Sequence, residues 1–247
     1  MSEIQTLYRD DHLLAVAKPS GLVVHRGWAR DEVVLMDLAR ELSGRRVHPL
    51  HRLDRGTSGV VLFAFEPEVV ARFQAQLHDG GASKRYLALV RGHPPASGTI
   101  DHPVPKARKS KERRPAVTDF RSLAVAGRYA LVEARPRTGR LHQIRRHFKH
   151  MSWPILGDVH YGKGDHNRLL RDRFGLNRLA LHAFEVQVDH PVTGERLRIQ
   201  APPPRDFTEP LAALDLEPTI GRVLEDLGLP EELPESYRAT GEGPNPM

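Results

Sequence analysis

The chain has 247 residues, a net charge of +6 at pH 7 and no cysteine, so disulfides, thiol catalysis and cysteine-ligated metals are excluded. No stretch approaches the roughly 18 uninterrupted apolar residues that a membrane span needs. The N-terminus has no apolar signal-peptide core, so we expect it to begin the fold of a cytoplasmic protein.

Short apolar runs in the first half of the chain predict strands separated by two helices. The strands are expected at residues 4–8, 12–18, 59–65 and 85–90. One helix is expected at 33–42, ending near Gly44, and another at 67–78, with proline at its first position. A turn at 19–21 follows the second strand.

The second half continues with strands joined by short turns. Strands at 115–124 and 129–135 have no long helix between them and are expected to pair antiparallel. A second such pair is expected at 179–189 and 195–201. Between the pairs, apolar residues spaced three and four apart predict a helix at 141–151. Because strands outnumber helices, the sequence favours an α+β fold with a large, mainly antiparallel sheet over a doubly wound parallel sheet.

The C-terminal end differs in composition from the rest of the chain. Residues 215–247 hold eight acidic and two basic residues, a net of −6 against +6 for the whole, so residues 1–214 carry about +12. We therefore predict one folded basic domain at 1–214 and a loosely attached acidic Pro/Gly-rich tail at 215–247, with one short helix at 219–227. The basic body predicts a polyanionic partner. Deletion of 218–247 is expected to leave function intact.

The stretch HRLDRGTSG (51–59) places one carboxylate, Asp54, between Arg52 and Arg55. A carboxylate within reach of an arginine stays ionised, which suits a nucleophile or a group that stabilises positive charge. From these residues alone, a buried Asp–Arg pair that ties down a loop is the more common reading.

Four stretches follow one another in the chain: KPSG (18–21) with HRLDRGTSG, KRYLALVRG (84–92), TGRLHQIRRH (138–147) and PILGDVHYG (154–162). In this order they resemble the pseudouridine synthases of the ribosomal large-subunit synthase A family, over about residues 4–202. Within the family the resemblance is greatest to a branch that modifies tRNA, because 23–32 and 174–195 also match it. Gly56 departs from that branch, which has proline there.

The resemblance implies an enzyme that isomerises uridine in RNA to pseudouridine. This reaction breaks the bond between ribose C1′ and uracil N1, rotates the base and joins C1′ to C5, so it implies no cofactor. Positive charge develops on the sugar as the first bond breaks, and a nearby carboxylate stabilises it. An ionised aspartate could attack C1′, add to C6 of the base or remove the C2′ proton, and the sequence leaves these three routes open.

Three residues carry the catalytic roles that the resemblance implies. Asp54 is the catalytic carboxylate, and Arg145 is its ion-pair partner. Tyr86 is the ring that stacks on the uracil, where stacking is worth roughly 1–3 kcal/mol per base. Arg145 belongs to a helix with a buried apolar stripe, whereas its neighbour Arg146 is expected to face solvent.

Further residues are predicted to contact the RNA. Extruding a uridine from a helix costs a few kcal/mol, and Arg52 is expected either to fill the vacated space or to support Asp54. His51 is expected to be structural or to contact phosphate, and the basic segment 105–115 to bind phosphates through its charge. The predicted RNA-binding residues are His51, Arg52, Arg55, Lys106, Arg108, Lys109, Lys111, Arg113, Arg114 and Arg140.

Three histidines, His142, His147 and His150, lie close together in the sequence. Their spacing differs from the i, i+4 pair of helical zinc motifs, and no acidic residue lies near them in sequence. We therefore predict no metal site.

The expected substrate is tRNA, at the T-stem uridine U65, with no membrane and no obligate protein partner. The same chemistry on ribosomal RNA or on the tRNA anticodon stem-loop is the first alternative. A non-catalytic basic RNA-binding protein is the second. A glycosidase acting on sugars is the third, although such enzymes use two carboxylates that flank the bond, and a sugar substrate gives no reason for a charge of about +12.

Overall fold

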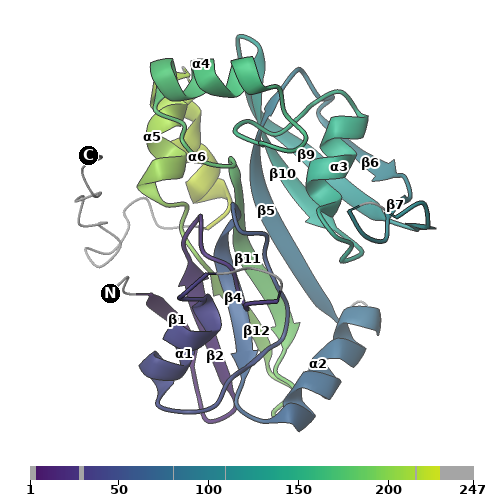
Figure 1. Cartoon of the computed structure of the whole chain (residues 1–247), viewed down its shortest axis with the longest axis vertical. Helices are drawn as coiled ribbons and strands as arrows, with labels where there is room; N and C mark the ends of the chain where they lie inside the picture. The colour runs from purple at the N-terminus through teal and green to yellow at the C-terminus, as the bar shows by residue number, and fades with distance from the viewer. Residues whose placement is uncertain (1–3, 28–30, 80, 109, 215, 229–247) are drawn as a thin grey trace.

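The computed structural model describes the chain apart from residues 1–3, 28–30, 80, 109, 215 and 229–247 (Figure 1). The described residues form a ten-stranded mixed sheet through the middle of the molecule and a separate two-stranded ribbon. The strands of the large sheet are β1 (Gln5–Arg9), β2 (Leu13–Lys18), β3 (His48–Pro49), β4 (Ser58–Ala64), β5 (Ala82–Arg91), β6 (Ser97–Asp101), β9 (Val117–Ala126), β10 (Tyr129–Pro136), β11 (Leu181–Asp189) and β12 (Arg196–Gln200). The ribbon pairs β7 (Val104–Pro105) with β8 (Arg113–Arg114).

Helices lie on the faces and at the upper end of the sheet (Figure 1). They are α1 (Leu35–Ser43), α2 (Pro67–Asp79), α3 (Gln143–His150), α4 (Gly164–Phe174), α5 (Arg205–Ala213) and α6 (Glu217–Asp226). In the described part of the chain, no helix has the length and apolarity to cross a bilayer.

The large sheet is almost entirely antiparallel. Its order is β1-β2-β4-β11-β5-β10-β9-β6, with β12 paired to β11 and β3 to β4. Among the described strands, β4 and β11 are the one parallel pair. The predicted antiparallel pairs, β9 with β10 and β11 with β12, are confirmed. The predicted α+β class with a mainly antiparallel sheet is therefore confirmed as well.

The central strands β2 and β4 are buried on both faces, which is why both read as continuous apolar runs. Leu13 and Ala15 of β2 face a cluster completed by Phe73 of α2. Leu14 and Val16 face the opposite cluster, which includes the buried side of α1. With a core on each face, the sheet is a rigid platform for the loops at its strand ends.

The C-terminal boundary differs from the predicted one. The helix predicted at 219–227 is present as α6, but it is packed on the body: Val223, Leu224 and Leu227 are buried in the main core. Arg198 of β12 also donates a hydrogen bond from Nη2 to the Leu227 carbonyl over 2.8 Å. The predicted loose tail therefore cannot begin at 215, while its remainder, 229–247, lies outside the described residues.

Two truncations separate the packed helix from the rest of the predicted tail. We expect a chain that ends at Gly228 to keep the melting temperature and activity of the full chain. A chain that ends at Leu214 loses four buried apolar side chains, Leu216, Val223, Leu224 and Leu227, each worth about 1.5–3 kcal/mol, so its unfolding free energy should fall by several kcal/mol. Urea titration measures both. Equal stability of the two truncated chains would show that α6 adds nothing to the fold.

Candidate active site

Asp54 lies in the turn that leads into β4, and the turn after β2 holds that backbone in place. Gly21 N donates a hydrogen bond to the Arg55 carbonyl over 2.8 Å. Ser20 Oγ donates to the Gly56 carbonyl over 2.9 Å. Two stretches that are far apart in sequence therefore form one unit around the carboxylate.

Lys18 is fully buried beneath this unit. Its Nζ donates to the carbonyls of Pro19 (2.8 Å), Leu22 (2.5 Å) and Arg55 (3.1 Å). Burial lowers the pKa of Lys18 to about 7. Three carbonyl acceptors nevertheless match the three N–H bonds of an ammonium group, and we therefore describe the side chain as charged. It stabilises the position of the Asp54 turn rather than contacting the carboxylate.

Asp54 is joined to Arg145, as the sequence predicted. Arg145 Nη1 donates to Asp54 Oδ2 over 2.9 Å. The opposite edge of the guanidinium holds Asp158 with two bonds, from Nε to Oδ2 (2.7 Å) and from Nη2 to Oδ1 (2.9 Å). Although burial alone would lower the pKa of Arg145, the hydrogen bonds and charges of Asp158 and Asp54 raise it above its usual value. The guanidinium is thus a fixed cation between two carboxylates.

Only one oxygen of the Asp54 carboxylate is engaged by this cation. The described residues donate no hydrogen bond to Asp54 Oδ1, and the Asp54 side chain is 19% exposed while that of Asp158 is 0% exposed. Asp158 is therefore buried and supports Arg145, whereas Asp54 has an oxygen that a substrate can reach.

Asp158 is held by its own loop, PILGDVHYG, for which the sequence analysis assigned no role. Its Oδ1 accepts hydrogen bonds from the backbone N–H groups of His160 (2.9 Å) and Tyr161 (3.0 Å). Burial would raise the pKa of Asp158, but Arg145 and these N–H groups hold it below its usual value. Asp158 therefore stays ionised and fixes the orientation of Arg145.

Replacing Asp158 tests this support. We expect Asp158→Asn to lower the unfolding free energy by about 3 kcal/mol, because it leaves a buried cation short of one partner. It should also lower kcat by about 10²-fold, because Arg145 then shifts relative to Asp54. Asp189→Asn is the matched control, since Asp189 forms an exposed ion pair with Arg196 and should cost about 1 kcal/mol or less. Equal effects of the two substitutions would contradict this role.

Tyr86 lies near the charge of Asp54. It lies on β5 between Ala134 of β10 and Ala183 of β11, and small neighbours on both sides leave room for its ring. The residue is 8% exposed. Burial and the nearby charge of Asp54 raise the pKa of Tyr86 above its usual value. Its phenol is therefore protonated at neutral pH and can donate a hydrogen bond.

A second group of side chains near Asp54 consists of His142, Tyr161 and Arg146. His142 Nε2 is 3.8 Å from Asp54 Oδ1. Its Nδ1 is 3.0 Å from Tyr161 Oη, which accepts a hydrogen bond from Arg146 Nε over 2.9 Å. The expectation that Arg146 faces solvent is wrong, because Arg146 also donates from Nη1 to the Pro105 carbonyl.

The family model for "RNA pseudouridylate synthase" matches residues 12–150, which include the Asp54 turn, β5 and α3. The chain belongs to the RNA pseudouridylate synthase family. A relative from Vibrio cholerae, tRNA pseudouridine synthase C, is 38% identical over 80% of this chain and 90% of its own length. The relative of the same name from Haemophilus ducreyi is 40% identical over 81% of this chain and 90% of its own length.

A third relative, tRNA pseudouridine synthase C of Pectobacterium carotovorum, is 41% identical over 80% of this chain, although the match spans only 58% of its length. Among solved structures, human RNA Pseudouridylate Synthase Domain Containing 4 superposes with a TM-score of 0.72 at 28% identity, covering 85% of this chain and 92% of that chain. The family resemblance and the fold that it implied are thus confirmed.

In this family member, the two arginines that flank Asp54 within two positions in the sequence, Arg52 and Arg55, do not pair with it. Arg55 forms a two-bond ion pair with Asp31 and is half exposed. Arg52 is exposed on the same turn. Both remain open to RNA, whereas the partner of Asp54 comes from the distant α3.

The surroundings of His51 differ from those expected of a residue that contacts phosphate. Its ring stacks on Phe73 with ring centroids 6.4 Å apart, and its Nε2 accepts a hydrogen bond from the Leu62 N–H over 3.3 Å. Burial, with a smaller effect of Lys84, lowers the pKa of His51 well below its usual value. These contacts support the structural reading of His51.

The basic segment includes the β7–β8 ribbon beside α3 (Figure 1), in which β8 is exposed and Val104 of β7 is buried. Part of its charge is paired, because Lys106 and Arg114 both contact Glu112. Arg108, Lys111 and Arg113 are exposed. Arg140 is exposed as well and donates to the Pro115 carbonyl over 3.1 Å. Of the residues predicted here, Lys109 lies outside the described part of the chain.

The three neighbouring histidines do not converge on one point. His142 faces Asp54, whereas His147 Nε2 is 2.9 Å from the His102 carbonyl. The His150 ring stacks on that of His102 at 3.7 Å. In the described ranges, no group of three or more His, Asp or Glu side chains could hold a metal ion. The absence of a metal in the reaction stays a prediction.

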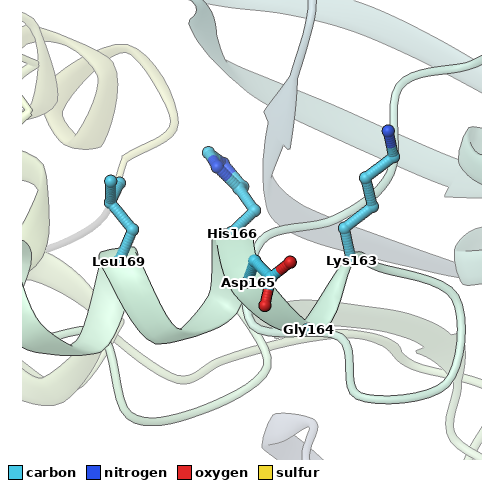
Figure 2. A pocket seen from close by; sticks show the side chains of 5 residues that line it. All are labelled: Lys163, Gly164, Asp165, His166 and Leu169. Carbon is cyan, nitrogen blue, oxygen red and sulfur yellow. The ribbon is translucent and has the colours of Figure 1, made fainter.

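A hollow of about 530 Å³ opens at the start of α4. Figure 2 shows His166, Leu169 and Lys163 standing around it, with Asp165 and Gly164 on the first turn of the helix. Asn167 of the same helix donates from Nδ2 to the Asp158 carbonyl over 3.0 Å. The residues that line the hollow do not include Asp54, Tyr86 or Arg145.

Proposed function

We propose that this chain isomerises a tRNA uridine to pseudouridine, most specifically the T-stem uridine U65, with Asp54 as the catalytic carboxylate and without a cofactor. The observation that carries the proposal is the Asp54–Arg145 pair, in which Arg145 binds Oδ2 and the described residues donate no hydrogen bond to Oδ1. Tyr86 is near enough for the charge of Asp54 to raise its pKa. The names of the relatives from Vibrio cholerae and Haemophilus ducreyi support tRNA as the substrate. The proposal places the protein in the cytoplasm, with RNA as its partner.

The arrangement suits the bond changes of the reaction. The C1′–N1 bond breaks, the uracil rotates, and a C1′–C5 bond forms; N1 gains a proton and C5 loses one, so the atoms balance. An anionic Oδ1 stabilises the positive charge on the sugar as the first bond breaks. The three routes of attack at C1′, addition at C6 and removal of the C2′ proton all use this same oxygen.

The neighbouring residues take supporting roles in the proposal. Arg145 holds the carboxylate in one orientation through Oδ2, which costs no reorganisation during the reaction. Tyr86 offers its ring to the uracil and its protonated hydroxyl to the rotating base. Arg52, exposed beside Asp54, is suited to the space that the extruded uridine leaves. The exposed cations of the β7–β8 ribbon are suited to RNA phosphates.

The boundary of the catalytic domain is proposed at Gly228 rather than at 214, since α6 completes the core. The acidic remainder would then be a separate tail. The proposal needs no second protein, because Asp54, Tyr86 and Arg145 all come from one chain.

Tritium release tests the substrate directly, because uridine labelled at C5 loses that hydrogen when C5 bonds to the sugar. We expect release from a tRNA T-arm hairpin and from full-length tRNA. We expect none from the hairpin in which the target uridine is replaced by cytidine. Release from ribosomal RNA fragments but not from tRNA would overturn the proposed substrate, and release from no RNA would overturn the proposed function.

A further inference from the structure

His142 adopts a backbone conformation that a side chain of its kind seldom takes. Its φ is 52°, and among the described residues only Ser152 shares a positive φ without being glycine. A left-handed residue of this type costs of order 1–3 kcal/mol and is concentrated at functional sites. At His142 the conformation ends the preceding turn directly before α3 and turns the imidazole toward Asp54.

The neighbouring groups favour one tautomer of this imidazole. Tyr161 Oη accepts a hydrogen bond from Arg146 Nε, which leaves the hydroxyl proton available for His142 Nδ1, 3.0 Å away. The proton of the imidazole then lies on Nε2, which faces Asp54 Oδ1 at 3.8 Å. The opposite tautomer would point a lone pair at a carboxylate.

The charge state of His142 follows from the groups around it. Burial lowers its pKa to about 4, against the opposing effect of the Asp54 carboxylate. Arg145 and Arg146 lower the pKa further, and Asp158 raises it. The remaining neighbours are the Tyr161 hydroxyl and the His160 ring, whose centroid lies 6.4 Å away. At neutral pH the imidazole is therefore an uncharged donor.

We propose that His142 is a positioning residue for pseudouridine formation, whose Nε2–H holds Asp54 Oδ1 in the direction of the uridine while Arg145 holds Oδ2. At 3.8 Å the contact is open in the free protein, and such contacts shorten when substrate fills a site. Tyr161 and Arg146 act behind it by keeping the proton on Nε2. This inference rests on the proposed function.

The test is chemical rescue of His142→Gly with added imidazole. Glycine accepts the positive φ without strain, so the variant keeps the backbone and removes only the ring. We expect kcat for tritium release from the T-arm hairpin to fall about 10²-fold, with KM changed less than threefold. Added imidazole should restore at least a tenth of the wild-type kcat. Ser152→Gly is the control, because Ser152 is the other described residue with a positive φ that is not glycine, and it is exposed. It should neither lose activity nor respond to imidazole.

Tyr161→Phe provides a second measurement that keeps the inference testable if His142→Gly does not fold. This substitution removes the hydroxyl that contacts His142 Nδ1, so the imidazole proton is no longer kept on Nε2. We expect kcat to fall about tenfold with an unchanged melting temperature. A folded His142→Gly protein with wild-type kcat, or one that imidazole does not rescue, would overturn the inference, as would wild-type kcat in Tyr161→Phe. Inactive wild-type protein would instead count against the proposed function.

Discussion

Replacing Asp54 by asparagine is expected to abolish pseudouridine formation while RNA still binds. The amide is close to the carboxylate in size but carries no charge, so it can neither stabilise positive charge on the sugar nor act as a nucleophile. We expect turnover to fall about 10⁴-fold or more, the magnitude typical of losing the central group of a catalytic unit. Tritium release measures turnover, and a filter-binding titration should give a Kd within threefold of wild type.

The control for this substitution is Asp37→Asn. Asp37, on α1, pairs with the exposed Arg26 and with Arg40. Its loss should leave turnover unchanged. Circular dichroism spectra establish that both variants are folded. If Asp54→Asn keeps a tenth of the wild-type turnover, the carboxylate is not the catalytic group and the site has been assigned to the wrong residue.

Gly59→Ala is expected to destabilise the fold by about 4 kcal/mol or more, the range reached by the most severe single substitutions. Gly59 has a φ of 120°, and a Cβ there would lie 2.0 Å from the Ala183 carbonyl oxygen. Gly59 and Ala183 are paired in the parallel β4–β11 contact. The methyl group must therefore push these strands apart, directly after the turn that carries Asp54. Urea unfolding, or loss of soluble protein, measures the effect.

Gly127→Ala separates the cost of backbone strain from the cost of a steric clash. Gly127 also has a positive φ, of 54°, but nothing lies within 4 Å of the site of its Cβ. It should cost only the conformational penalty of about 1 kcal/mol. Similar losses for the two variants would mean that β4 and β11 adjust to the added methyl group and that their close approach is not essential.

The strands could be predicted from the sequence because a strand that is buried on both faces has a continuous run of apolar residues, as in LLAVAK and SGVVLFA. Helix α4 was not predicted, since Leu170 is the one residue it buries among the described side chains. The start of α3 was placed at Leu141 rather than Gln143, because no pattern reveals that His142 is left-handed. Elements held by few apolar contacts leave little periodic signal.

The site was partly predictable for a different reason. Asp54 and Arg145 are 91 residues apart, and only the family resemblance could bring them together. Asp158 stood in a stretch that carried the resemblance, but its role depends on a contact with Arg145 that spacing does not show. Arg146 was wrongly expected to face solvent. Helical periodicity describes one helix by itself, whereas the Pro105 carbonyl and Tyr161, which accept hydrogen bonds from Arg146, belong to other segments.

The most direct test of the central claim is to map pseudouridine at single-nucleotide resolution in unmodified tRNA and ribosomal RNA after incubation with the wild-type protein or with Asp54→Asn. Our account predicts one new pseudouridine, in the T stem of tRNA, made by the wild-type protein and absent with Asp54→Asn. Binding of both proteins to RNA with no pseudouridine formed by either, or the same modification by both, would contradict it.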